Sequence, residues 1–159
     1  MSFKLCLLLL ISLLAACQPT PPSLAPLHLV VRPADEACAY VAASGDTVIP
    51  FGRYPLCATE RFGQLALVMK PGVGWVGINR QEHVLFKLFV FDNGPDYPAE
   101  GVRRIVGATG LLGYADTTGR VVLTPRYEAA FPFDSGRARV GRRCRPETDG
   151  EHSWWNCAE

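Results

Sequence analysis

The stretch GLLGYADTTGRVVLTPRYEAAFPFDSGRARV, residues 110–140, decides the fold of this 159-residue chain. An apolar segment, residues 113–116, is followed by the polar turn 117–119 and then by the β-branched run 121–123. Gly119 can adopt the positive φ that a tight hairpin requires, and β-branched residues favour the second strand. This stretch therefore predicts a β-hairpin.

The remainder of the stretch predicts a third short strand. Pro125 is expected to end the second strand, because proline has no N–H to donate to a β-ladder. Ala138 and Val140 then alternate with Arg137 and Arg139, which is the period of a strand with one solvent-exposed face. The whole chain contains 13 Pro and 15 Gly, a composition that excludes a long-helix or coiled-coil protein. The prediction is an all-β fold.

The same pattern recurs along the chain with a period of about 37 residues. Tyr40 and Tyr114 are separated by 74 residues, and so are Gly45 and Gly119. A weaker copy lies between them, starting near Trp75. The predicted repeats are residues 38–68, 74–106 and 110–141. Such units bury their apolar faces against their neighbours, so we expect a stacked or propeller-like arrangement.

This succession of a Gly-Tyr strand, an Asp-x-x-Gly turn, Val-Val-Leu, Pro-x-Tyr and Phe-x-x-Gly-x-Ala-x-Val resembles the WG-repeat family over about residues 38–141. Leu112-Gly113 lacks the family's Trp, and Trp75-Val76 lacks its Gly. In the middle copy Asn79 replaces the Asp and Glu82 replaces the turn glycine, so the resemblance does not fix that hairpin. The resemblance implies β-hairpin units that serve as interaction scaffolds and share no catalytic residues.

The N-terminus has the composition of an export signal. Lys4 precedes a run of ten apolar residues, too short to span a bilayer, which predicts a signal peptide over residues 1–16. The tetrad Leu14-Ala15-Ala16-Cys17 resembles the bacterial lipobox, which implies cleavage before Cys17 and acylation of that residue. The alternative is ordinary secretion with an incidental cysteine. Gln18 follows the cysteine, and by resemblance to other lipoproteins this predicts sorting to the outer membrane.

The rest of the chain divides into a tether, one domain and a tail. Residues 17–33 are rich in proline and predict a semi-extended tether, although Leu27 to Val31 could instead begin the first strand. The β-repeat domain is predicted over residues 34–145 and a disulfide-closed tail over 146–159.

Cysteine usage agrees with export. Besides Cys6 in the signal and Cys17, four cysteines remain: Cys38, Cys57, Cys144 and Cys157. An even number in an exported chain implies disulfides, with three possible connectivities. The local pairs 38–57 and 144–157 would close loops at the two ends of the domain, each stabilising by ~3 kcal/mol. A zinc site is the alternative, but no Cys-x-x-Cys occurs in the sequence.

The charge and motifs argue against nucleic-acid binding and catalysis. A net charge of +1 provides no field for nucleic acid. No catalytic motif, metal site or cofactor site stands out, and His83 is expected to be solvated. Asp92, Asp96 and Glu100 could form a calcium loop or an acid–base pair, but the intervening Asn-Gly-Pro favours a simple turn.

Two features near the C-terminus are candidates for partner binding. Five arginines lie between residues 137 and 145, among them Arg142 and Arg143, and they suit anionic groups or protect an edge strand. Trp154 and Trp155 could pack on the last repeat, held by Cys157, or could stack on a sugar or meet a partner. Adjacent residues on a strand point to opposite faces, so one Trp could be buried and the other exposed.

These observations favour a non-enzymatic, lipid-anchored outer-membrane protein whose β-repeat domain binds a protein or an envelope polymer. Two alternatives remain: an inhibitor lipoprotein of an envelope enzyme, and an envelope-polymer hydrolase that uses Asp92, Asp96 and Glu100.

Overall fold

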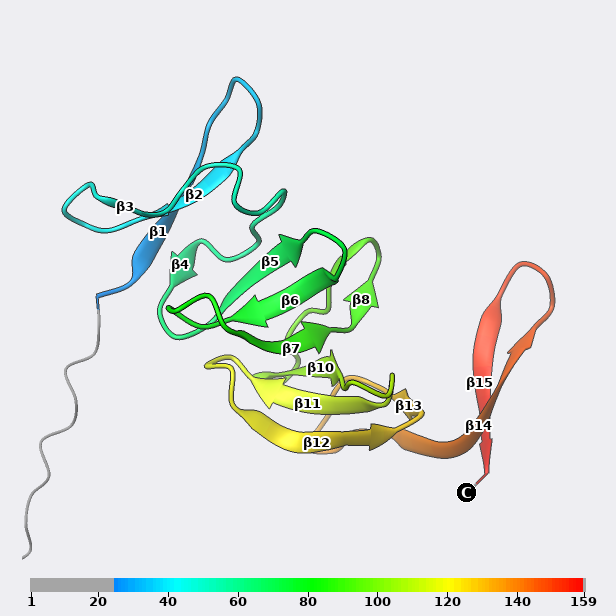
Figure 1. Ribbon diagram of the computed structural model, residues 1–159. Helices are drawn as coiled ribbons and strands as arrows, with labels where there is room; N and C mark the ends of the chain where they lie inside the picture. The colour runs from blue at the N-terminus through cyan, green and yellow to red at the C-terminus, as the bar shows by residue number, and fades with distance from the viewer. Residues whose placement is uncertain (1–24, 159) are drawn as a thin grey trace, which may run out of the picture.

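The computed structural model describes residues 25–158, and all regular structure among them is β (Figure 1). The predicted signal peptide, the lipidation site Cys17 and the first part of the tether lie outside the described residues. No helix between residues 25 and 158 is long and apolar enough to cross a membrane. The prediction of an all-β chain with two disulfides is confirmed.

The described strands form four open sheets, in each of which neighbouring strands follow one another in the order named. The first contains β3 (Thr47–Ile49), β2 (Cys38–Val41), β1 (Leu27–Val31) and β4 (Arg61–Phe62). The second contains β12 (Val121–Tyr127), β11 (Leu112–Asp116), β10 (Val102–Val106), β7 (Val84–Leu88), β6 (Gly74–Ile78) and β5 (Ala66–Lys70). The third contains β13 (Ala129–Ala130), β14 (Val140–Thr148) and β15 (Ser153–Ala158). The fourth contains β8 (Val90–Phe91) and β9 (Gly94–Pro95).

Three consecutive strands form an antiparallel meander at three places along the chain. The meanders are β1-β2-β3, β5-β6-β7 and β10-β11-β12. In each, the middle strand is paired on both of its edges. Strands β14 and β15 pair in the same way as the first two strands of a meander, and no third strand follows within the described chain.

The second turn of each meander has the same hydrogen bonds, at positions 37 residues apart. The amide of the first turn residue donates to the carbonyl of the residue four positions later. The amide of the residue three positions later donates to the carbonyl of the first turn residue. These first residues are Ala42, Asn79 and Asp116. In the second and third turns a side-chain oxygen, of Asn79 or Asp116, also accepts from two amides. The two residue types therefore support the same turn.

Position 82 shows that the middle hairpin does not need the family's turn glycine. Gly45, Glu82 and Gly119 occupy equivalent positions, and all three have positive φ, at 92°, 59° and 95°. The Glu82 carboxylate accepts hydrogen bonds from the Tyr54 hydroxyl at 2.7 Å and from Arg53 Nε at 2.9 Å. These contacts hold a side chain in a conformation that otherwise favours glycine.

The residue pairs across the second and third strands also follow the 37-residue spacing. They are Tyr40–Ile49, Gly77–Phe86 and Tyr114–Leu123. In the middle pair the aromatic residue is on the third strand and the second strand has a glycine, whereas in the other two pairs the aromatic residue is on the second strand. A Cβ atom at Gly77 would lie 2.6 Å from the Phe86 ring, so the ring fills the space of the missing side chain. Tyr40 and Tyr114 are fully buried and contact Phe62 and Phe133 edge to face, with centroids 5.1 and 5.0 Å apart.

Only two of the meanders share a sheet, and proline occupies the joining position in or directly after the third strand of the first and last meanders. Lys87 and Leu88 at the end of β7 pair with Val106 and Ile105 of β10. The equivalent two-residue positions contain Pro50 after β3 and Pro125 in β12, and proline lacks the N–H that a ladder uses. The prediction that Pro125 ends its strand is wrong, because β12 continues to Tyr127. As an edge strand with irregular register, β12 tolerates the missing donor.

Two other boundaries differ from the sequence expectation. The first strand begins at Leu27, so the second half of the predicted tether belongs to the sheet. The strand expected at residues 138–140 is β14, which starts at Val140 and runs on to Thr148, across the predicted domain boundary at residue 145. Its length comes from pairing with β15, a partner that the repeat pattern did not include.

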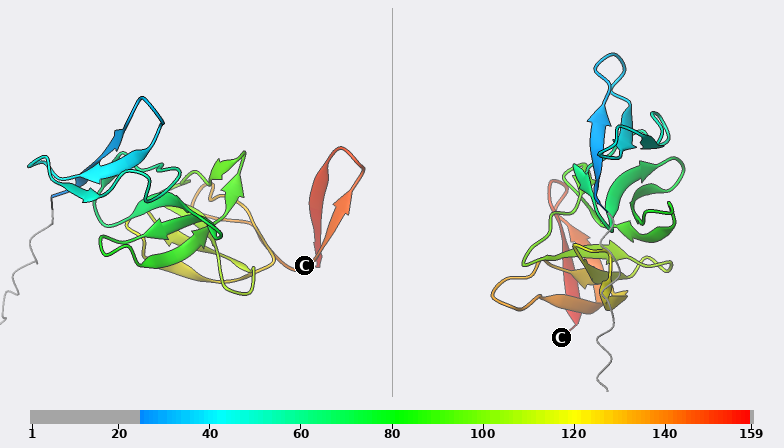
Figure 2. Two further views of the ribbon diagram at one scale, coloured as in Figure 1. Left: turned by 45° about the horizontal axis from the view of Figure 1, so that its top comes forward. Right: turned by 90° about the vertical axis from the view of Figure 1, so that its left-hand side faces the viewer.

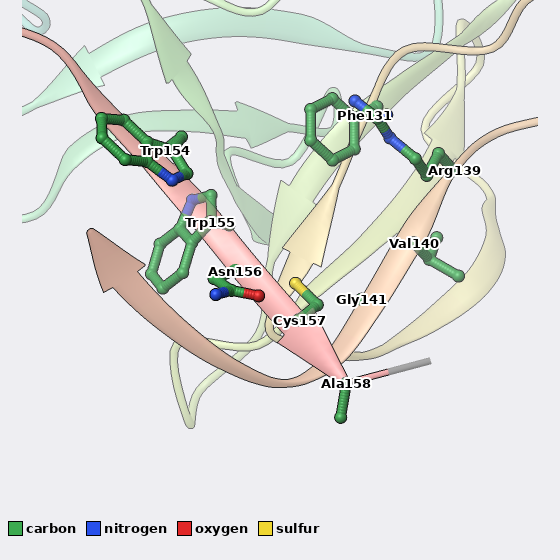
Figure 3. A pocket seen from close by; sticks show the side chains of 9 residues that line it. All are labelled: Phe131, Arg139, Val140, Gly141, Trp154, Trp155, Asn156, Cys157 and Ala158. Carbon is green, nitrogen blue, oxygen red and sulfur yellow. The ribbon is translucent and has the colours of Figure 1, made fainter. Parts of the chain in front are cut away.

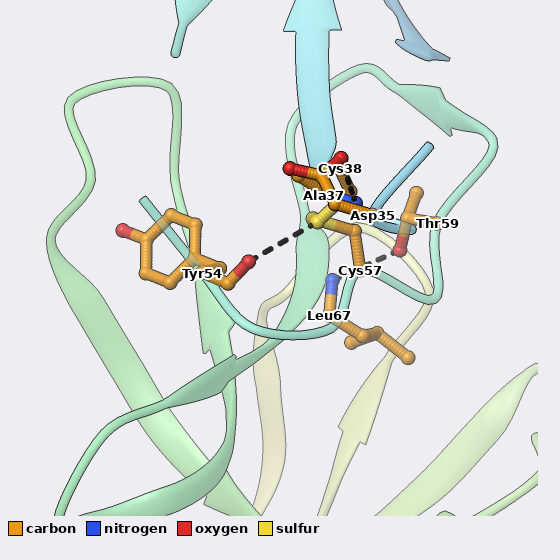
Figure 4. The surroundings of a disulfide bond; sticks show 7 residues. All are labelled: Asp35, Ala37, Cys38, Tyr54, Cys57, Thr59 and Leu67. Carbon is orange, nitrogen blue, oxygen red and sulfur yellow. Dashed lines mark hydrogen bonds between the residues drawn. A yellow bond between two sulfur atoms is a disulfide. The ribbon is translucent and has the colours of Figure 1, made fainter. Parts of the chain in front are cut away.

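The first disulfide lies within the core of the first meander (Figure 4). Cys38 and Cys57 are joined, with Cα atoms 6.1 Å apart, and Cys38 is buried. The bond ties β2 to a loop segment that itself pairs with Val68 of β5. The Cys38–Cys57 bond therefore links the first two meanders.

Candidate binding site on the C-terminal arm

The hairpin of β14 and β15 projects from the rest of the molecule, and we call residues 142–158 the arm (Figures 1 and 2). Only the start of β14 is paired with the body, through Ala129 to Gly141 and Ala130 to Val140. Beyond Gly141 the two strands pair with each other alone. The arm is therefore a two-stranded ribbon with exposed faces and open edges, an arrangement of marginal stability in water.

A disulfide closes the arm at its base. Cys144 and Cys157 lie opposite each other in the ladder, with Cα atoms 3.9 Å apart. A Cβ atom at Gly141 would overlap both sulfur atoms, so this position accepts only glycine beside the bond. The Glu128 carboxylate accepts a hydrogen bond from the Cys144 amide and connects the base of the arm to the body.

A groove of about 590 Å³ lies between the arm and the body (Figure 3). Residues 154–158 of β15 line it, and Phe131, Arg139, Val140 and Gly141 complete its wall. Only alternate residues of a strand share a face. Because five consecutive residues line the groove, the edge of β15 bounds it, and this is the edge that has no partner strand among the described residues.

The groove combines aromatic surface with positive charge. Arg139 is exposed, and its guanidinium carbon lies 4.1 Å from the centroid of the Phe131 ring. Arg139 is the one charged residue among those that line the groove. Tryptophan and arginine are enriched among residues that dominate binding energy, and a guanidinium forms strong bonds with carboxylates. The groove is therefore suited to an apolar ligand that carries negative charge.

Both tryptophans predicted as candidates line this groove, and both are about half exposed, at 46% for Trp154 and 49% for Trp155. Of the alternatives that the sequence left open, burial of one tryptophan is wrong, because no layer of the described chain covers either face of the arm. Trp154 Nε1 donates to Glu147 at 3.1 Å, and Asn156 donates to the other oxygen at 2.8 Å. Glu147 therefore fixes the orientation of Trp154 from across the ladder.

The two predicted arginines lie at the base of the arm outside the groove lining. Arg142 is exposed, and its guanidinium lies 5.6 Å from the Tyr127 ring centroid. Arg143 is exposed at a register shift between the strands, with φ of 52°. Sequence reasoning placed Arg139 in the arginine cluster but did not assign Phe131 to a site. No local signal brings Phe131 to the arm, since its position depends on how β14 leaves the sheet.

The three carboxylates of the enzyme hypothesis have separate structural roles. Asp96 is buried, and its two oxygens accept from Arg104 Nε at 2.8 Å and Nη2 at 2.6 Å. Glu100 accepts a hydrogen bond from the Gly136 amide at 2.9 Å. Asp92 lies in the turn between β8 and β9, with φ of 50°. The geometry offers no convergent acid–base pair among them.

The Asp96–Arg104 pair joins three segments of the chain. Arg104 of β10 also donates to the Ala130 carbonyl at 3.2 Å, and its guanidinium lies 4.2 Å from the Phe89 ring centroid. Neighbouring Arg103 is less well paired: its side chain donates to the Asp96 carbonyl at 3.3 Å, and burial lowers its pKa. The ion pair is a structural connection between β10, β13 and the segment that follows β9.

The other titratable side chains of the described residues do not form a metal-binding cluster. Residues 25–158 contain no group of three or more His, Cys, Asp or Glu side chains placed to hold a metal ion. His83 is exposed in the turn before β7, where its backbone makes the turn hydrogen bonds.

Comparison with known proteins identifies the repeat. Residues 113–141, from β11 to the start of β14, match the family model described as "WG containing repeat". Residues 113–141 are therefore similar to a WG-containing repeat, which confirms the resemblance in the segment where the motif is most complete. No curated protein and no solved structure gave a match.

Proposed function

We propose that this protein is a non-enzymatic, lipid-anchored protein of the bacterial outer membrane that binds a partner protein through the groove beside the arm. The observation that carries the proposal is the groove itself, which Trp154 and Trp155 line from β15 and which Phe131 and the exposed Arg139 line from the body. Large exposed aromatic surface rimmed by polar groups marks interaction sites. An extended protein segment also fits a groove bounded by a strand edge better than a glycan polymer does.

The WG-containing repeat and the anchor supply the context of the proposal. In this proposal the repeat domain is a rigid support for the arm, and the family resemblance carries no shared catalytic residues. The lipobox-like tetrad ending at Cys17 would attach the chain to the membrane through acyl groups, each buried methylene contributing about 0.8 kcal/mol. The two disulfides suit the oxidising periplasm.

The proposal is tested by site-specific photo-crosslinking in intact cells. A photoreactive amino acid replaces Trp155 in the groove, and in a matched control it replaces Val122, which is similarly exposed on β12 at 43%. We expect one dominant protein adduct from position 155 and none of the same mass from position 122. Absence of a position-specific adduct would contradict the proposed binding role.

The anchor is tested independently with the Cys17→Ser variant. We expect the variant to appear in the soluble periplasmic fraction, whereas the unmodified chain stays with the outer membrane after washing with high salt. Equal membrane retention of the two proteins would contradict lipid anchoring.

A further inference from the structure

We infer that the groove binds its partner by strand addition: an extended segment of the partner protein pairs antiparallel with the open edge of β15 and supplies a third strand, which no described strand provides there. The inference rests on the proposed function and names the chemistry of the ligand. That ligand is a segment of alternating apolar and polar residues with acidic residues at its N-terminal end.

The first argument is the internal precedent of the three complete meanders. Their middle strands are β2, β6 and β11, and each pairs on one edge with the strand before it and on the other with the strand after it. Strand β15 pairs with β14 before it and with nothing on its other edge among the described residues. The strand position that β3, β7 and β12 occupy elsewhere is open beside β15.

The second argument is that this edge has no protection against pairing. Natural sheets block exposed edges with charged residues, prolines or bulges. Residues 153–158 read SWWNCA and contain neither a charge nor a proline, and the ladder runs without a register shift from Ser153 to Cys157. The other strand of the arm contains both a proline, Pro146, and an irregularity near Arg143. The protection is therefore on the edge of β14, and the edge of β15 is free to pair.

The third argument is the charge around the groove, which sets the direction of the ligand. An antiparallel strand beside β15 would begin near Ala158, at the base of the arm, and end near its tip. The base has the positive charges, since Arg139 lines the groove and Arg142 and Arg143 lie next to it. Acidic residues are therefore favoured at the N-terminal end of the ligand.

The chemistry of the ligand follows from the strands that fill the same position in the meanders. These strands begin Thr-Val-Ile, Val-Leu-Phe and Val-Val-Leu, so β-branched and apolar residues predominate. On the ligand, the apolar side chains share one face and would contact the tryptophan on that face, whereas the other tryptophan would lie beside the polar side chains. Such recognition takes its affinity from main-chain hydrogen bonds and its specificity from alternate side chains.

The test uses the exported chain with Cys17→Ser and a defined peptide probe, acetyl-Asp-Asp-Val-Thr-Val-Thr-Val-Thr-amide. Amide hydrogen exchange is followed by NMR while the probe is added. We expect every second amide of residues 153–158 to gain protection by about tenfold or more, because only alternate amides of an antiparallel strand point to one edge. Arg139→Glu should weaken probe binding by about tenfold, whereas Arg126→Glu, at an exposed arginine on β12, should leave it unchanged.

Two control probes test the pairing and its direction. A probe that is N-methylated at every Val and Thr cannot donate to β15 from these residues and should not bind. A probe with the two Asp residues moved to its C-terminus should bind about tenfold more weakly. Equal binding of all probes, or protection spread evenly over the arm, would overturn the inference. Dimerisation of the protein through β15, measured by sedimentation equilibrium, would also overturn it, since the edge would then belong to a second copy.

The experiments separate this inference from the function on which it rests. A position-specific crosslink at residue 155 without alternating protection by the probe would preserve partner binding and overturn strand addition. Loss of the crosslink itself would contradict the proposed function.

Discussion

Strands β11 and β15 occupy the same place in their units, yet their surroundings differ. Strand β11 pairs with β10 and β12, and its residues 112–115 are all buried. Strand β15 pairs with β14 alone, and its two tryptophans are about half exposed. A strand of similar apolar character is thus core in one place and surface in another. Burial depends on the third strand and on the residues packed over the meander, such as Phe133 against Tyr114, and within the described chain β15 has neither.

The largest change in unfolding free energy is expected from the buried Asp96–Arg104 ion pair, which belongs to the body and not to the arm. Asp96→Ala leaves Arg104 buried without its carboxylate, so we expect the free energy of unfolding of the body to fall by about 3–5 kcal/mol. Denaturant unfolding followed by tryptophan fluorescence measures the change. The exposed pair Arg32–Asp35 provides the control, and Asp35→Ala should have a much smaller effect. Equal effects would show that the Asp96–Arg104 pair is not buried in solution.

The two disulfides should separate the body from the arm. Replacing both Cys144 and Cys157 by Ser removes about 3 kcal/mol from the arm, and we expect its amides to exchange freely while the melting temperature of the body is unchanged. Replacing both Cys38 and Cys57 by Ser should destabilise the body by a similar amount. If the C-terminal pair also lowered the melting temperature of the body, the two regions would be one cooperative unit.

Two turn glycines at equivalent positions should differ in sensitivity. Gly45→Ala and Gly119→Ala both force a side chain into positive φ, at a cost of about 1–2 kcal/mol. A Cβ atom at Gly119 would also lie 2.9 Å from Leu85 Cδ1, whereas Gly45 has open space. We therefore expect Gly119→Ala to lower the unfolding free energy more than Gly45→Ala, as measured in denaturant. The reverse order would place the third turn away from the second meander.

The smallest effect is expected from the acid dependence of the third turn. The Thr118 hydroxyl and nearby amides donate to Asp116 and lower the pKa of its carboxyl below the ordinary value. The stabilisation is thus present above the unfolded pKa and is lost as pH falls through the lower folded pKa. Asp116→Asn should flatten the unfolding free energy measured across this range, since Asn79 makes the equivalent turn without a charge. An unchanged slope would contradict this role for Asp116.

The sequence predicted the local elements of the fold better than their assembly. The 37-residue period located the three turns, because Asp, Asn and Gly act through hydrogen bonds and φ angles within a few residues. It did not predict that β7 and β10 join two meanders in one sheet. That pairing depends on Lys87 and Leu88 standing where the other copies have a proline, a difference that is meaningful only when the strands are aligned.

The candidate site was predicted in part. Trp154 and Trp155 are unusual residues in a tail and were identified, but their exposure depends on the absence of a covering layer in the described chain. The carboxylates at 92, 96 and 100 are close in sequence, yet Asp96 turns inward to Arg104, which lies on a different strand. Phe131 and Arg139 reach the groove through the path of the chain between β13 and β14.

Amide hydrogen exchange along β15 in the protein without ligand tests the central claim most directly. If β15 is paired only with β14, its amides should alternate between slow exchange, for those bonded to β14, and fast exchange, for those on the open edge. The amides of β11 should all be slow. Uniformly slow exchange along β15 would mean that its edge is already covered, and uniformly fast exchange would mean that the arm does not form; either result would contradict an open strand position beside β15.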